Sequence, residues 1–196
     1  MSQRLQEALE RLERALVQVR CPVVEGLQPG LTEADIRGQL GAVDLDPPED
    51  LITLFGWHNG YHQPSEQEWW GGWIGPSLQT RSLAQALDDY PTVYASIAEF
   101  DEDDPRWLPV MWCGDPIIMY CGDDSRRRGT ITARMYEYPL DESHKISSLA
   151  VPIEWWAGFL ETGDYRFTPL SDGTGTWDSL VTADRMTADQ LSSGMV

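Results

Sequence analysis

A helix with a clearly signalled start is encoded by residues 45–60, LDPPEDLITLFGWHNG, and this segment constrains the fold more than any other. Asp46 and Glu49 have the spacing of a D-x-x-E capping box, in which two side chains bond the N–H groups of the first helical turn. Pro47 suits the first helical position because proline has no N–H that needs a partner. The pattern predicts a helix that starts at residue 47.

An Asn-Gly pair marks the other end of this helix. One face of the helix carries three apolar residues, Leu51, Leu54 and Phe55. Asn59 and Gly60 favour the left-handed backbone with which many helices end. We therefore expect Trp57 to lie at the exit turn and to be structural.

Length and charge bound the class of protein. With 196 residues, the chain is expected to form one domain with its own core. Its 32 acidic residues exceed its 14 basic residues by 18, and Lys145 is the single lysine. A net charge of -18 disfavours binding to nucleic acid or to anionic membranes and favours a basic protein partner. The alternative is that the acidity only keeps the chain soluble and monomeric, and a monomer is the expected state.

The cysteines and the N-terminus indicate the compartment. Cys21, Cys113 and Cys121 are odd in number, widely spaced and outside any C-x-x-C pattern, which favours reduced thiols over disulfides or a zinc site. The first residues lack the apolar core of a signal peptide, and no apolar run approaches the length of a membrane span. A soluble, cytoplasmic protein is expected.

Several further helices are predicted. Apolar residues recur at spacings of four and three: Leu5, Leu9, Leu12, Leu16 and Val19. The ion pairs Glu7–Arg11 and Glu10–Arg14 are expected on the opposite face. The other helices are a short one behind a Thr32–Asp35 capping box, one that Ser82 caps and Pro91 should kink or split, and one from Ile153 to Gly163.

Strands are expected at residues 107–113, 117–121 and 130–136, separated by short turns, which favours an antiparallel meander. In the last strand apolar and polar residues alternate, so one face should be buried and the face with Thr132 should be exposed to solvent. Residues 61–76 show neither the helical nor the strand periodicity of apolar residues and are interpreted as a loop. The fold class predicted is α+β, a single domain with an antiparallel sheet flanked by helices. Residues 1–170 should form this domain, and residues 171–196 a loosely ordered tail.

The order of these elements resembles the SMI1/KNR4 (SUKH) superfamily. Five residues match its helix that ends in W-x-N-G: Pro48, Leu51, Trp57, Asn59 and Gly60. The W-L-P-V run at residues 107–110 is similar to a strand of the family, Gly114 and Asp115 to its G-D hairpin, and residues 153–165 to its closing helix.

The resemblance implies a SUKH-like α+β fold and, for bacterial members, an immunity protein that binds and neutralises a polymorphic toxin. Eukaryotic relatives suggest a regulatory scaffold as the alternative. Family members share no catalytic constellation, so neither enzymatic activity nor a cofactor is expected. The excess of arginine over lysine favours a bacterial origin.

Two segments are candidates for partner binding. The first is a group of three tryptophans, Trp69, Trp70 and Trp73, around a Gly-Gly pair. Exposed tryptophans anchor protein interfaces because they bury a large area at low entropy cost. The alternative is that these side chains form a lid that folds back on the core. Four consecutive acidic residues follow a predicted helix, and they form either a surface that steers a cationic toxin or a solvated helix end: Asp101, Glu102, Asp103 and Asp104.

The remaining motifs do not indicate a metal site, a catalytic nucleophile or a phosphate-binding loop. His58 and His62 have the spacing of two zinc ligands on a helix, but the Asn-Gly pair between them should break that helix, so no metal is expected. No nucleophile motif or phosphate-binding loop occurs. The basic run at residues 126–128 is interpreted as a solvated turn, with phosphate binding as the less favoured alternative.

Overall fold

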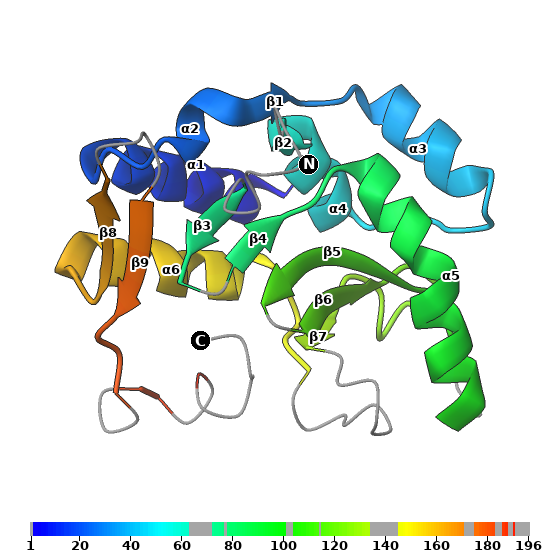
Figure 1. Cartoon of the computed structure of the whole chain (residues 1–196). Helices are drawn as coiled ribbons and strands as arrows, with labels where there is room; N and C mark the ends of the chain where they lie inside the picture. Colours follow the sequence, from blue (N-terminus) through cyan, green and yellow to red (C-terminus); the bar gives the residue numbers. More distant parts are fainter. Residues whose placement is uncertain are drawn as a thin grey trace.

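The computed structural model describes residues 2–62, 72–76, 78–100, 104–113, 115–133, 145–170, 175–182, 186, 187 and 190 (Figure 1). Its helices are α1 (Gln3–Gln18), α2 (Val23–Gly26), α3 (Glu33–Gly41), α4 (Glu49–Trp57), α5 (Leu83–Phe100) and α6 (Ala150–Thr162). Its strands are β1 (Leu27–Pro29), β2 (His58–Tyr61), β3 (Trp73–Gly75), β4 (Leu78–Thr80), β5 (Trp107–Cys113), β6 (Asp115–Tyr120), β7 (Ile131–Ala133), β8 (Tyr165–Pro169) and β9 (Gly175–Ser179). The predicted α+β class is confirmed.

The central sheet has the order β3-β4-β5-β6-β7, and every neighbouring pair is antiparallel. The three strands expected from the sequence are therefore joined by β3 and β4. Residues 73–75 of β3 lie inside the segment 61–76 that was interpreted as a loop, so that interpretation was wrong for them. A run of three residues is too short to show the alternation by which strands are recognised.

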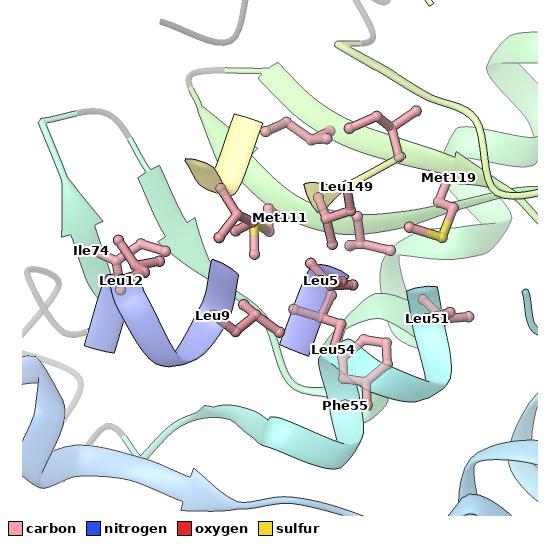
Figure 2. Packing of buried hydrophobic residues seen from close by; sticks show 14 of the residues in the cluster. Leu5, Leu9, Leu12, Leu51, Leu54, Phe55, Ile74, Met111, Met119 and Leu149 are labelled. Atoms are coloured by element: carbon pink, nitrogen blue, oxygen red, sulfur yellow. The ribbon is translucent and has the colours of Figure 1, made fainter. Parts of the chain in front are cut away.

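The main core lies between one face of the sheet and the helices α1, α4 and α6. Figure 2 shows the leucines of α1 pointing at apolar residues of α4 and of the sheet. The predicted periodicity of α1 is confirmed, since Leu5, Leu9, Leu12 and Leu16 are all fully buried. The expected pair Glu7–Arg11 is wrong, because Arg11 instead forms an ion pair with Glu161 of α6.

Helix α5 covers the other face of the sheet, at β5 and β6 (Figure 1). Val93 and Ile97 pack there against Trp107, Ile118 and Tyr120, which form a second buried cluster. The sheet therefore has apolar residues on both faces. Pro91 lies within α5, which continues past it to Phe100. Thr132 is 2% exposed, so the prediction of a wet face for this strand was wrong.

The start of α4 differs from the predicted capping box. The helix begins at Glu49, and no side chain caps it. Asp46 instead forms an ion pair with Arg128, at 2.5 Å, while its N–H donates to the carbonyl of Cys121. The residues before α4 are thus bound to the end of β6 and to the loop that follows it.

Asn59 and Gly60 join two elements instead of ending a helix. Both belong to β2, and the Asn59 Oδ1 accepts a hydrogen bond of 2.8 Å from the N–H of Leu83 in the first turn of α5. Gly60 has a φ of +75°, and a Cβ at this position would lie 2.4 Å from the backbone nitrogen of Ser82. The Asn-Gly pair therefore fixes where α5 starts, although the predicted left-handed residue is real.

A second helix start is capped from a distant element in the same way. The Asp50 Oδ2 accepts hydrogen bonds from the Ser148 hydroxyl, at 2.7 Å, and from the N–H of Leu149, at 3.0 Å, just before α6. The predicted caps of Thr32 on α3 and Ser82 on α5 are confirmed, because each hydroxyl accepts a bond from the N–H three residues on.

The C-terminal region contains a β-hairpin. Strand β8 pairs with β9 in register from Tyr165–Ser179 to Pro169–Gly175, across the boundary predicted at residue 170. The expectation of a loosely ordered tail was therefore wrong for residues 175–179. Phe167 and Trp177 face each other across this hairpin and pack against the core, which adds the tertiary contacts that a two-stranded ribbon needs for stability.

No helix of the described residues combines the length and the apolar composition that a membrane crossing needs.

The cap on α5 gives a stability prediction. Asn59→Ala should lower the free energy of unfolding by about 1 kcal/mol, because the N–H of Leu83 loses its acceptor. Asn59→Asp, which retains the acceptor, should stay close to the parent. Chemical denaturation checks both variants, and an Asn59→Ala protein as stable as the parent would contradict the capping role.

Candidate protein-binding face

A row of partly exposed side chains crosses three neighbouring strands of the sheet. Trp73 of β3 pairs directly with Gln79 of β4, which pairs directly with Trp112 of β5. Directly paired residues point to the same face of a sheet, so the three side chains lie side by side. All three are partly exposed. We call Trp73, Gln79 and Trp112 the aromatic row.

A β-bulge decides which face carries Trp112. Trp107 pairs with Tyr120 and Pro109 with Ile118, whereas Met111 pairs with Ile117, so one extra residue, Val110, lies between the two registers. Strict alternation from Trp107 would place Trp112 on the opposite face, toward the main core. The bulge reverses that assignment and puts Trp112 on the face that also bears α5.

Arg81 fixes the indole of Trp112. Its guanidinium carbon lies 5.0 Å from the centroid of the Trp112 ring, within the range of a cation–π contact. The same guanidinium is 2.8 Å from the carboxylate of Asp89 in α5. The side chain of Arg81 is 20% exposed and that of Asp89 is 37% exposed, so the cluster is at the surface but is partly shielded from water. It links β4, β5 and α5.

Of the predicted partner-binding tryptophans, Trp73 lies in β3, at one edge of the described sheet, and contributes to the aromatic row. Trp69 and Trp70 lie outside the described residues, as do Asp101, Glu102 and Asp103. These five residues stay predictions. The sequence alone does not point to Trp112, Gln79 or Arg81, because no local signal shows the bulge that brings Trp112 to this face.

Asp104 is held in an internal network. Its carboxylate accepts hydrogen bonds from Arg106, the shortest at 2.6 Å, and from the hydroxyl of Tyr120, also at 2.6 Å. The hydrogen bonds from Arg106 are the main reason why the pKa of Asp104 falls to about 2. Arg106 also forms an ion pair with the exposed Asp123. Asp104 therefore supports the fold at the end of β6 and is not a freely solvated helix end, while its contact with a partner stays a prediction.

The residues that carry the resemblance make structural contacts where they are described. Trp57 is partly exposed, and its indole N–H donates to Glu13 of α1 at 2.9 Å. Asp115 opens β6 and pairs with Cys113, whereas Gly114 lies outside the described residues. Together with the link from Asn59 to α5, these contacts show that the motif holds elements together.

Four histidine and cysteine side chains are described: His58, His62, Cys21 and Cys121. The Nδ1 of His58 is 2.9 Å from the carbonyl of Gln28, and His62 is exposed beyond β2. Within the described ranges, no three His, Cys, Asp or Glu side chains are grouped as ligands for a metal ion. Burial raises the pKa of Cys21 to about 11 and that of Cys121 to about 12, so both thiols are protonated at neutral pH.

The basic run at residues 126–128 is not a simply solvated turn. The guanidinium of Arg127 lies 4.8 Å from the ring centroid of Tyr120 and 5.5 Å from that of Trp107. Arg128 forms an ion pair with Asp46, whereas Arg126 is exposed. Two of these arginines therefore hold the loop after β6 against the protein.

A small cavity lies between α4, β2 and the sheet, with a volume of about 10 Å³. Trp57, His58, Thr80 and Arg81 are among the residues that line it. This volume suits a single water molecule, not an organic ligand.

Comparison with protein-family models and with curated proteins finds no match for this chain.

The network around Asp104 predicts a pH dependence of stability. The pKa of this carboxyl falls from 3.8 to about 2 on folding, so its contribution is complete above pH 4 and is lost as the pH drops toward 2. Asp104→Asn should therefore be less stable than the parent at pH 7, and the difference should shrink between pH 4 and 2. Denaturant titrations at several pH values measure this, with Glu25→Gln, an exposed carboxylate of α2, as the control. A difference that stays constant with pH would contradict it.

Proposed function

We propose that this chain is a non-enzymatic, cytoplasmic protein-binding domain that neutralises a basic toxin, like the bacterial immunity proteins of the SMI1/KNR4 (SUKH) superfamily. The observation that carries the proposal is the aromatic row, with two tryptophans and an amide on one partly exposed face of the sheet. Tryptophan is enriched among the residues that supply most of the energy of protein interfaces.

The charge of the chain supports a basic partner. At -18, its field speeds the approach of a cationic protein and slows that of an anionic one. Near the aromatic row, the positive charge of Arg81 is balanced by the carboxylate of Asp89, so it does not repel a basic partner. The surface around the tryptophans is thus suited to a partner with basic residues at its rim.

The contacts of the motif also support the family relationship. The residues that carry the resemblance connect elements of the fold. Asn59 caps α5, Gly60 allows the close approach of Ser82, and the indole of Trp57 donates a hydrogen bond to α1. A motif with this role preserves a scaffold and leaves the binding surface free to change. That combination suits a family whose members meet different partners.

The direct test is co-expression with the product of the adjacent gene in a sensitive host. The parent chain should restore growth and co-purify with that product. Trp73→Ala combined with Trp112→Ala should weaken binding by more than about tenfold, because interface anchors typically contribute ~2 kcal/mol or more. Trp155→Ala, a partly exposed tryptophan of α6, is the matched control and should bind normally. A complex without any effect on growth would favour the regulatory-scaffold alternative, and no complex would contradict the proposal.

The charge also predicts how binding responds to salt. The association rate should fall steeply from low to high salt, because exposed charges are screened beyond about 8 Å at physiological ionic strength. Stopped-flow mixing with the purified toxin measures this rate. An association rate that does not change with salt would show that the acidity serves solubility alone.

A further inference from the structure

We propose that Arg81 and Asp89 are positioning residues that lock Trp112 as the rigid anchor of the partner-binding face, and that this anchor receives an apolar side chain of the partner. The inference rests on the proposed function, because it specifies how the same face binds. It names two residues that contribute through Trp112 and not through contacts of their own.

The geometry of the lock comes from three separate elements. Trp112 is supplied by β5, Arg81 follows β4, and Asp89 lies in α5. The guanidinium lies over the indole and is also paired with the carboxylate, so it cannot leave the ring without breaking its ion pair. An arginine is suited to this role because its planar group can stack on a ring and bond a carboxylate at the same time.

The elements that carry the lock are themselves fixed. The first turn of α5 is capped by Asn59, and Ser82 and Gln85 exchange hydrogen bonds at its start. Tyr90, one residue after Asp89, is buried. Asp89 is therefore presented from a fixed helix, and the orientation of Arg81 and Trp112 is set before any partner binds.

A rigid side chain loses little conformational entropy on binding. Ordering a mobile side chain at an interface reduces affinity by roughly two- to tenfold, and a tryptophan that is already ordered avoids this loss. Trp73 lies at the edge of the described sheet, whereas Trp112 lies two strands further in and is clamped by Arg81. Trp112 is thus the better candidate for the centre of the interface.

The cation on the ring also limits what the partner can bring. The face of an indole attracts one positive charge through its quadrupole, and Arg81 already uses that attraction. A second cation cannot stack on that face of the ring, because the guanidinium already occupies it. An apolar or aromatic side chain has no such restriction, so basic residues of the partner belong at the rim of the interface.

The lock can be tested without a partner by ¹⁹F NMR of the whole chain labelled with 5-fluorotryptophan. The Trp112 signal is assigned by its loss in Trp112→Phe. In the parent, we expect this signal to be shifted from that of free tryptophan. Arg81→Met, which keeps the aliphatic stem, should move it toward the free value, whereas Arg37→Met, which breaks an exposed ion pair of α3, should leave it unchanged. A Trp112 signal that is the same in the parent and in Arg81→Met would overturn the proposal.

A second arm uses the co-purified toxin and separates this inference from the proposed function. Arg81→Met should bind roughly three- to tenfold more weakly, with a faster dissociation rate, while the variant still unfolds in one cooperative transition. Dissociation from the parent should be nearly independent of salt, because the anchor contact is apolar. Two results would overturn the inference and leave the proposed function intact. One is dissociation that salt accelerates. The other is an Arg81→Met affinity equal to that of the parent, although Trp73→Ala combined with Trp112→Ala still disrupts binding. Absence of any complex would instead refute the proposed function, and the inference with it.

Discussion

The burial of α1 is the interaction on which the remaining structure depends. Its leucine face enters the space between α4, α6 and the inner face of the sheet, where Leu5, Leu9, Leu12 and Leu16 have no exposed surface. Burying a leucine side chain contributes about 1.5–3 kcal/mol, so four of them outweigh the exposed ion pairs between α1 and α6, which contribute about 1 kcal/mol or less each. The pairs of Arg4 and Arg11 with α6 therefore orient a contact that the leucines stabilise.

The two faces of the sheet are covered unequally, and this leaves the aromatic row partly exposed. The face toward α1 is fully packed, while on the other face α5 covers the residues around Trp107 and Tyr120. The bulge at Val110 moves Trp112 onto this second face, where it is partly exposed. A side chain that would otherwise pack in the core is thereby left partly exposed, and this one-residue shift creates the aromatic row.

Polar groups from distant elements cap two of the helices and so join the layers. Asn59 bonds the start of α5, and Asp50 bonds the turn before α6. Each bond satisfies an N–H that a helix start leaves without a partner, and it also ties a segment near residue 55 to a helix much later in the chain. The candidate binding face depends on the first of these bonds, because α5 carries Asp89.

Local rules explain what the sequence determined by itself. The leucine stripe of α1, the caps of Thr32 and Ser82, and the strand at residues 107–113 each follow from residues within a few positions of one another, and all are confirmed. Tertiary structure alone decided the bulge at Val110, the partner of Asp46 and the role of Asn59, because these depend on which elements meet in space. A side chain such as that of Asp46 has several possible partners, and only the packed fold shows which one is within reach.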